Sequence, residues 1–418
     1  MADNEDMTTS RRRAVGRPPR TKQTVRHPRY VYIRRRVIFG LSLVTLIYGL
    51  YLGGTLAVAL TNQSYGVSLS ARGAEWGREH GMGWAVTWFE QRYYSINKPK
   101  TGGTPSANQF GSGSSTVNVP RDGHLPAPAT VVSPVTTPQP GEGVWHAVGR
   151  TTPSGIPAIY EAFIRPDAVH TSYVVGLAWM DPTLLEAQLY SGSFIPGGGP
   201  YKHSAPILPK TTGNLAAVFN AGFRMQDANG GYYTDGKTVL PLRKGAAAAV
   251  IFKDGTMTIG QWGRDIKMTK DVREVRQNLD LIVDGGQPVA GLDSTNTHRW
   301  GKTLGGRYDV WRSGMGVTAN GALVYAGGPA LTIGSLADVL IRAGAVRAME
   351  LDINTDWVQY STFSAPLGAQ VNGGHGQRLL STMVGLPSRY FTTWWNRDFF
   401  TVSLRTPALV QVTTTTKP

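Results

Sequence analysis

The stretch SLADVLIRAGAVRAMELD, Ser335 to Asp352, decides the fold. Its first half predicts a helix, because apolar residues recur at the spacing of one helical face: Leu336, Val339, Leu340 and Ala343. Ser335 is expected to cap this helix, with Asp338 three residues further on, and Gly344 is expected to end it. The second half, Ala345 to Asp352, is then a strand.

Other apolar runs of strand length surround this unit, each bounded by Gly, Asp or Asn. They are YVVGLAWM (173–180), NLAAVFN (214–220), AAAAVIF (246–252), NLDLIVD (278–284) and ALVYAG (322–327). Many strands with few helices predict a mixed α/β (α+β) globular domain over residues 141–405.

A single membrane span is expected ahead of this domain. Val37 to Leu60 comprises 24 residues without a charge, enough to cross a bilayer core. Because Arg34, Arg35 and Arg36 precede it, the N-terminus is predicted to be cytoplasmic and the main domain extracellular. The alternative is a cleaved signal peptide, with a cleavage motif at Ala57 to Ala59. The length of the apolar run favours an uncleaved signal-anchor in the cell membrane.

The remaining segments follow from composition. Residues 1–36 form a basic cytoplasmic tail, and residues 61–96 a juxtamembrane amphipathic segment with several Trp and Tyr. Residues 97–140 are a linker rich in Gly, Ser, Thr and Pro, expected to be extended, and residues 406–418 a disordered tail.

The charge of the chain does not indicate a nucleic-acid partner. Of the formal net charge of +15, the tail of residues 1–36 carries +8, so the folded part is only weakly basic. No stacking-aromatic motif accompanies a basic face. The chain has no cysteine, which excludes disulfides, thiolate metal sites and a cysteine nucleophile.

Polar residues stand at the ends of four predicted strands: Asn220, Asp284, Arg312 and the pair Glu350 and Asp352. Glu350 and Asp352 fall on one face of their strand, where two carboxylates can perform acid/base chemistry. Arg312 is the expected partner that keeps one of them ionised. Each of these residues alone is also compatible with ordinary turn chemistry.

No cofactor or resident metal site is predicted. The histidines His170, His203, His298 and His375 lack the spacing of a zinc helix. Asp352, Asn354 and Asp356 alternate like the start of a calcium loop, but the following Gly and distal Glu are missing. An EF-hand is therefore excluded, and a looser divalent-cation site stays open.

At these clusters the chain resembles the phosphodiester glycosidase family, over about residues 206–356. The resemblance rests on the order of Asn220 to Phe223, Lys244 to Gly255, Arg312 to Gly316, and the helix that leads to Glu350-Leu351-Asp352. The anchor, spacer and domain plan is similar to membrane-bound members from high-GC Gram-positive bacteria. One departure follows Asp352, where Ile353 to Trp357 replaces the glycine run and Ser typical of the family.

The resemblance implies a membrane-anchored hydrolase that cleaves a sugar-1-phosphodiester bond in a cell-envelope polysaccharide or glycolipid. The resemblance singles out Asp352 as the leading catalytic residue. Glu350, on the same strand face, and Arg312, expected to hold the phosphodiester, complete the predicted catalytic residues. Substrate-binding residues are expected to be Asn220, Phe223, Asp284, Asn354 and Trp357. Trp357 either stacks on a sugar or fills the core. Because the loop after Asp352 is altered, the alternative is a catalytically inactive envelope carbohydrate-binding or scaffold protein.

Overall fold

The computed structural model describes residues 28–111, 123–294, 297–301, 308–392 and 397–405. Most of the predicted basic tail, the middle of the predicted linker (112–122) and the predicted C-terminal tail lie outside these residues. The chain forms two compact units, one ending at Ala57 and one beginning at Val58. The first consists largely of α1 (Arg29–Thr61), which is long and apolar enough to cross a membrane.

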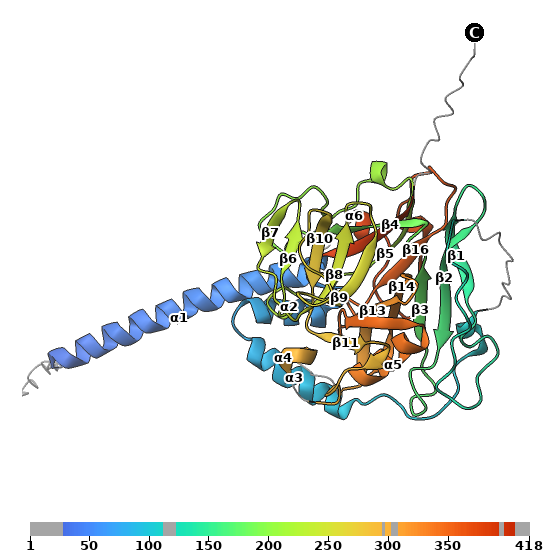
Figure 1. Cartoon of the computed structure of the whole chain (residues 1–418). Helices are drawn as coiled ribbons and strands as arrows, with labels where there is room; N and C mark the ends of the chain where they lie inside the picture. The colour runs from blue at the N-terminus through green and yellow to red at the C-terminus, as the bar shows by residue number, and fades with distance from the viewer. Residues whose placement is uncertain (1–27, 112–122, 295–296, 302–307, 393–396, 406–418) are drawn as a thin grey trace, which may run out of the picture. The chain divides into compact units, whose positions relative to one another are not determined.

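The second unit contains three sheets, in which every described strand pair is antiparallel (Figure 1). This architecture confirms the prediction of a mixed α/β fold with many strands and few helices. The eight-stranded sheet has the order β1 (His146–Thr151), β2 (Pro157–Ile164), β3 (Val175–Met180), β14 (Leu323–Leu331), β13 (Val310–Thr318), β15 (Ala345–Glu350), β11 (Leu281–Asp284) and β12 (Gln287–Pro288).

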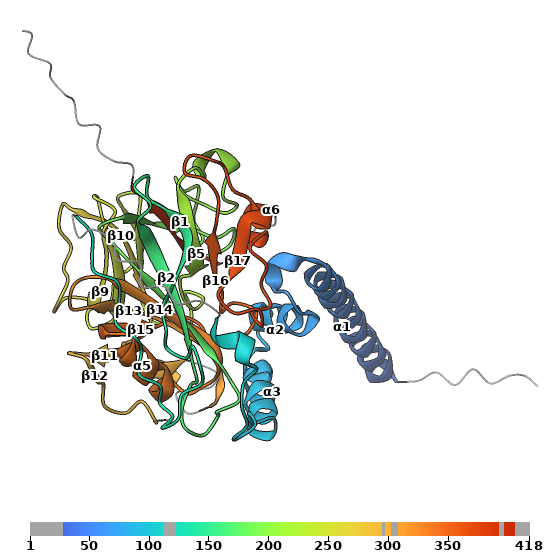
Figure 2. The same ribbon diagram turned by 90° about the vertical axis from the view of Figure 1, so that its right-hand side faces the viewer.

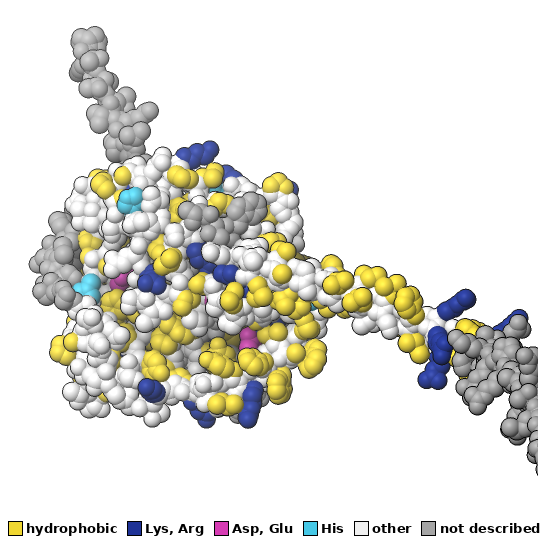
Figure 3. All heavy atoms as spheres, turned by 180° about the vertical axis from the view of Figure 1, so that it is seen from behind, with side chains coloured by type: hydrophobic (Ala, Val, Ile, Leu, Met, Phe, Trp, Pro, Cys, Tyr) yellow, Lys and Arg dark blue, Asp and Glu magenta, His cyan; other side chains and the backbone are white. Residues whose placement is uncertain are grey.

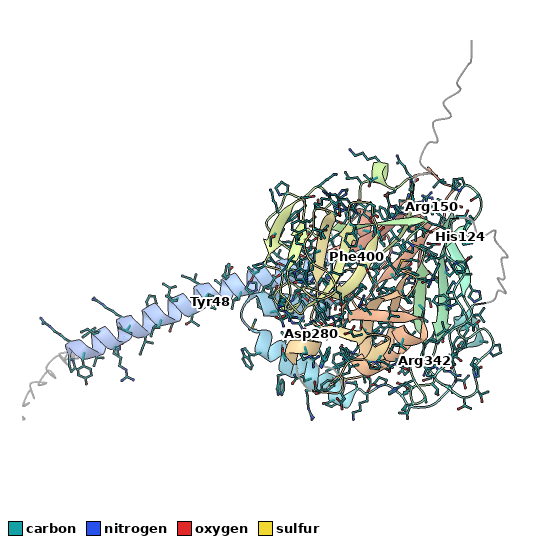
Figure 4. The ribbon with its side chains drawn as sticks, viewed as in Figure 1. Tyr48, His124, Arg150, Asp280, Arg342 and Phe400 are labelled. Carbon is teal, nitrogen blue, oxygen red and sulfur yellow. The ribbon has the colours of Figure 1, made fainter. Side chains whose placement is uncertain are left out.

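The other two sheets have five strands each. One has the order β7 (Lys237–Leu240), β6 (Tyr232–Thr234), β10 (Val272–Gln277), β8 (Ala247–Phe252) and β9 (Met257–Gln261). The other has the order β17 (Gly376–Arg378), β16 (Tyr360–Phe363), β5 (Leu215–Asn220), β18 (Phe399–Leu404) and β4 (Leu185–Tyr190). Side chains from all three sheets meet in one buried cluster, which includes Phe400 of β18 (Figure 4).

The helix predicted from Ser335 is α5 (Ile333–Arg342), and its cap differs from the prediction. Thr332 is the N-cap, and its hydroxyl accepts from the Ser335 amide at 3.1 Å. The Ser335 hydroxyl accepts in return from the Thr332 amide at 2.9 Å. Ser335 is therefore the third helical residue of a capping box and not the cap itself. The apolar stripe of α5 packs with Ala348 and Val324 of the eight-stranded sheet.

Among the described residues, the second unit has four further helices. They are α2 (Leu69–Glu79), α3 (Gly83–Ile96), and the single turns α4 (Thr297–Trp300) and α6 (Arg389–Thr392). Short 3₁₀ turns occupy Gln63–Tyr65, Ala107–Phe110, Pro209–Thr211 and Gly373–His375. Figure 2 shows α2 and α3 next to each other along one side of this unit, and the two helices pack together.

The described parts of the predicted linker lie against the sheets. Phe110 and Val131 are buried in two core clusters. Arg342, at the end of α5 (Figure 4), donates to the Val132 carbonyl at 3.1 Å. Although the composition of residues 97–140 offers little apolar surface, these few anchors suffice to place the described linker residues on the domain.

Candidate active site

The candidate active site lies at the C-terminal end of the stretch from Ser335 to Asp352. Strand β15 lies between β13 and β11, and it ends at Glu350. Beyond it, the Leu351 amide donates to the Ser313 carbonyl and the Ser313 amide to the Asp352 carbonyl, both at 2.8 Å. The backbone that carries Asp352 is thus held against β13 by sheet-like hydrogen bonds, which fixes the position of its carboxylate.

Asp352 is 1% exposed and lies in a network of charge-assisted hydrogen bonds. Its Oδ2 pairs with Arg397 Nη1 at 2.5 Å. Its Oδ1 accepts from the amides of Ile353 at 2.8 Å and Asn354 at 3.1 Å. Burial raises the pKa of Asp352 to about 6, although Arg397 and the two amides oppose this rise. The Asp352 carboxyl therefore titrates near neutral pH.

A second acidic residue reaches the same guanidinium from α2. Glu75 Oε1 lies 2.7 Å from Arg397 Nη2, and Glu75 Oε2 lies 3.2 Å from Arg224 Nη1. Burial disfavours the charged form of Glu75, but Arg397, Arg224 and Arg78 outweigh it and lower the pKa of Glu75. Arg397 thus joins an ionised Glu75 to Asp352.

These groups line a small polar pocket with an internal volume of about 50 Å³. The loop after β15 contributes Asp352, Ile353 and Asn354, and the helices α2 and α3 contribute the opposing wall. The complete lining is Glu75, Arg78, Glu90, Tyr94, Phe223, Arg224, Asp227, Asp352, Ile353, Asn354 and Arg397. Four carboxylates and three guanidinium groups line it, so the pocket is strongly polar and offers both signs of charge to a ligand.

The region of the chain that matches a known family ends at the pocket. Residues 213–352 match the family model described as phosphodiester glycosidase. The match runs from the start of β5 to Asp352 itself. It leaves out Glu75 and Arg397, which contact each other and complete the pocket of this phosphodiester glycosidase-like region.

Three solved structures are similar to the chain. The catalytic domain of zebrafish N-acetylglucosamine-1-phosphodiester alpha-N-acetylglucosaminidase, auto-inhibited by its pro-peptide, has 14% identity and a TM-score of 0.39, covering 63% of this chain and 88% of its own. A hypothetical protein from Synechocystis has 12% identity and a TM-score of 0.32, with coverages of 59% and 62%. A Burkholderia pseudomallei protein described as exported has 13% identity and a TM-score of 0.25, with coverages of 55% and 74%. No curated protein matches the chain.

Of the predicted site residues, three line the pocket: Asp352, Asn354 and Phe223. Asn220 lies deeper, where its amide donates to the Ser313 hydroxyl at 3.1 Å and its carbonyl accepts from the Tyr325 hydroxyl at 3.0 Å. Since Ser313 also holds the backbone of Asp352, Asn220 supports the site from below and does not line the pocket.

Arg312 pairs with one of the two carboxylates, as expected, but this pair lies outside the pocket. Arg312 and Glu350 form a fully buried ion pair with each other. Arg312 therefore does not reach the pocket and is not placed to hold a phosphodiester. Burial raises the pKa of Glu350 to about 7, against the opposing effect of Arg312. The two carboxylates predicted to share one dry pocket thus have separate arginine partners.

Asp284 and Trp357 also lie away from the pocket. Asp284 pairs with Arg264 at 2.6 Å and stands opposite Arg347 in the register of β11 and β15, at the end of the sheet remote from Asp352. Trp357 is 1% exposed, and its ring lies 4.2 Å from the Arg397 guanidinium carbon. Of the two interpretations of Trp357, the structure favours the core-filling one, with a cation–π contact that supports Arg397.

Eight pocket residues were not predicted from the sequence, and three of them form the charged network next to Asp352: Glu75, Arg224 and Arg397. Arg224 directly follows the Asn220 to Phe223 motif, so its proximity to that motif was an available signal. Arg397 is 45 positions from Asp352 along the chain, and nothing local points to it. Glu75 lies in a segment interpreted as separate from the domain. In the described part of the chain, no three His, Asp or Glu side chains are arranged to hold a metal ion.

Proposed function

We propose that the chain is a membrane-anchored, extracytoplasmic hydrolase that cleaves the glycosidic bond of a sugar-1-phosphodiester in the cell envelope. The observation that carries this proposal is the pairing of Asp352 with Arg397 in a polar pocket, at the end of the region that matches the phosphodiester glycosidase family. The family match supports the reaction class, and the pocket supplies the groups that such a reaction needs.

Asp352 is the proposed general acid/base or nucleophile. With a pKa of about 6, it exchanges a proton readily near neutral pH. Cleavage next to a phosphate builds positive charge on the sugar ring, which an ionised carboxylate stabilises. Glu75 lies on the other side of the Arg397 guanidinium and also lines the pocket.

Arg397 and Arg224 are the proposed phosphate-binding pair, in place of the buried Arg312. Both guanidinium groups converge on the carboxylate of Glu75, so they already form a binding site for an oxyanion. Guanidinium groups make forked hydrogen bonds to phosphate as they do to carboxylate. In this proposal the phosphodiester competes with Glu75 for these two arginines.

Membrane anchoring is proposed from α1. This helix has 33 residues, and an 18-residue window within it has a mean hydropathy of 1.9, high enough for a spanning segment. Arg34 to Arg36 lie at its N-terminal side, so the positive-inside rule places residues 1–28 in the cytoplasm and the domain outside. The envelope glycan or glycolipid is then on the same side as the pocket.

A second candidate function is binding of an envelope glycan without catalysis. The observation that favours it is the small enclosed part of the pocket: about 50 Å³ holds only a few water molecules, so a sugar ring would lie in the open mouth of the pocket. A binding protein can use this mouth and the outer surface of the domain without bringing the sugar into contact with Asp352.

The two functions are separated by product release. The full chain in nanodiscs is incubated with a panel of sugar-1-phosphodiesters, and free sugar is measured. Wild type and the Asp284→Asn control are expected to release sugar, and Asp352→Asn is expected to release none. Normal turnover by Asp352→Asn removes the proposed role of Asp352. Retention on envelope material without any released sugar establishes the binding function instead.

A further inference from the structure

Helix α3 has two contrasting faces. On one side, Glu90 and Tyr94 line the pocket. On the other side lies what we call the aromatic face of α3, whose large apolar side chains are open to solvent: Trp84 (77% exposed), Trp88 (66%), Phe89 (63%), Tyr93 (50%) and Ile96 (62%). Figure 3 shows hydrophobic side chains gathered on this side of the molecule.

Such a face needs a partner. Trp, Phe and Tyr each bring a large apolar surface, and neighbouring exposed side chains of this kind mark a site of protein or membrane interaction. The fold does not supply the partner, since no residue of α3 is buried among the described residues. The contact partner of these apolar side chains therefore lies outside the described residues.

The chain itself indicates the bilayer as that partner. Only residues 62–68 separate α1 from α2, and seven residues span at most about 25 Å. The start of α2 therefore stays near the bilayer surface, and α3 packs against α2. Trp and Tyr are the side chains enriched at that level, where an apolar ring meets a wet polar edge. Arg92, Lys98 and Lys100 are exposed nearby and suit anionic head groups.

We propose that the aromatic face of α3 lies in the interface of the bilayer, and that the pocket beside it takes the head group of a membrane-resident lipid whose sugar is linked through a phosphodiester. This rests on the proposed function and on its membrane anchor. A helix that is embedded on one face and lines the pocket with the other holds the pocket at head-group level. A sugar phosphodiester on a lipid is presented at that level while its hydrocarbon chain stays in the bilayer.

The reaction on such a lipid is a hydrolysis. The bond between C1 of the sugar and the bridging phosphate oxygen breaks, and a bond forms between C1 and the oxygen of water. One proton of the water stays on the new sugar hydroxyl, and the other balances the phosphomonoester. The sugar is released into the aqueous phase, and the phosphate remains on the lipid. No oxidant, reductant or second substrate is required.

The position of α3 is tested by depth measurements, which the absence of cysteine makes straightforward. Spin labels are attached to Trp88→Cys or Phe89→Cys in the full chain, reconstituted in bilayers of phosphatidylcholine and phosphatidylglycerol. Ala319→Cys, in the exposed turn between β13 and β14, is the control. Labels on α3 are expected to be relaxed by oxygen and shielded from a water-soluble nickel chelate. Equal access of the chelate to labels on α3 and at position 319 overturns the proposal, as does spin–spin broadening from a second copy of the chain.

The substrate class is tested by activity on two substrates. The triple variant Trp84→Ser, Trp88→Ser, Phe89→Ser is expected to lower kcat/KM about ten-fold for a lipid-linked sugar phosphodiester in the same bilayers. Its activity on a short-chain soluble analogue is expected to be unchanged. Val169→Ser, at an exposed apolar residue elsewhere, is the matched control. Equal losses on both substrates overturn the lipid specificity. If the labels show embedding but neither substrate is hydrolysed, the proposed function fails while the membrane contact stands.

Discussion

At the scale of single residues, the charge balance around Asp352 determines its protonation. Burial is the largest influence and raises the pKa of Asp352, Arg397 lowers it, and the carboxylate of Glu75 raises it again. Glu75 and Asp352 share the guanidinium group of Arg397. A change in either side chain therefore alters how strongly Arg397 stabilises the negative charge of the other.

Glu75→Gln is therefore expected to lower the pKa of Asp352. The substitution removes a neighbouring negative charge and leaves Arg397 to pair with Asp352 alone. The limb of the pH profile of kcat/KM that belongs to Asp352 should move to lower pH by about half a unit to one unit. Glu79→Gln makes the same charge change on the same helix outside the pocket lining, and it should leave the limb in place. An unchanged limb in Glu75→Gln, or a shift to higher pH, contradicts this coupling.

Glu161 provides a second prediction at this scale, on stability. It is fully buried on β2, its side chain has Thr362 as a distant partner at 3.5 Å, and burial raises its pKa to about 8. The folded state therefore holds this proton more tightly than the unfolded chain, whose Glu pKa is about 4.3. The contribution of Glu161 to the free energy of unfolding is therefore fully present below the pKa of Glu in the unfolded chain. It falls as the pH rises from there toward 8, by up to about 1.4 kcal/mol per pH unit.

Glu161→Gln should remove that loss, because the amide stays neutral. Chemical denaturation of the variant and wild type should give similar midpoints at pH 5 and a higher midpoint for the variant at pH 8. Glu186→Gln, exposed on β4, should change neither midpoint. A variant that is destabilised equally at both pH values would contradict this prediction. It would show that Glu161 affects stability through its packing and not through the cost of ionising its carboxyl group.

At the scale of elements, the unit of α5 and β15 shows what sequence patterns resolve. The apolar stripe, the strand and the Gly344 stop were predicted from local spacing, and the helix and strand are confirmed. The cap was misplaced by three residues, since Ser335 and Thr332 are both good capping residues and only their reciprocal hydrogen bonds decide between them. Local patterns thus fix an element and leave its terminal residues open.

Thr332→Ala is expected to destabilise the domain by about 1 kcal/mol, the usual cost of losing a helix cap. The Ser335 amide would lose its acceptor at 3.1 Å, and the box would lose one of its two bonds. Equilibrium unfolding in urea measures the difference. Thr238→Ala removes a hydroxyl at an exposed position of β7 and should cost much less. A loss at position 332 no larger than at 238 would show that tertiary packing alone holds the start of α5.

At the scale of the whole molecule, most of the fold could be predicted and much of the site could not. Asp352, Asn354 and Phe223 belong to local motifs, and the pocket contains all three. Arg397 and Glu75 come from positions 45 and 277 residues away from Asp352, and only the tertiary fold brings them to it. Asp284 was misplaced because a strand-end position does not say which end of the sheet faces the pocket, and Arg312 because its position does not reveal that its side chain pairs with the buried Glu350.

The attachment of α2 to the domain is the long-range feature on which the pocket depends. Asp356, in the loop after Asp352, accepts hydrogen bonds from the amides of Val67 at 2.6 Å and Ser68 at 2.8 Å. Its Oδ2 accepts from the Ser68 hydroxyl at 3.1 Å. Ser68 is also the N-cap of α2, so one carboxylate fixes both the start of the helix and its position beside the pocket.

Asp356→Ala should therefore release the N-terminal end of α2 without unfolding the sheets. Hydrogen bonds to a charged acceptor contribute about 1.5–3 kcal/mol each, so exchange of the Val67 and Ser68 amides should accelerate at least about ten-fold. Hydrogen exchange read by mass spectrometry on the full chain in nanodiscs measures this, with the strands β13 and β14 as the internal reference. Asp293→Asn, at an exposed acid, should leave the exchange pattern unchanged. Accelerated exchange that also extends across β13 and β14 would mean global destabilisation. Unchanged protection of the Val67 and Ser68 amides would mean that packing and Glu75 hold α2 in place without Asp356.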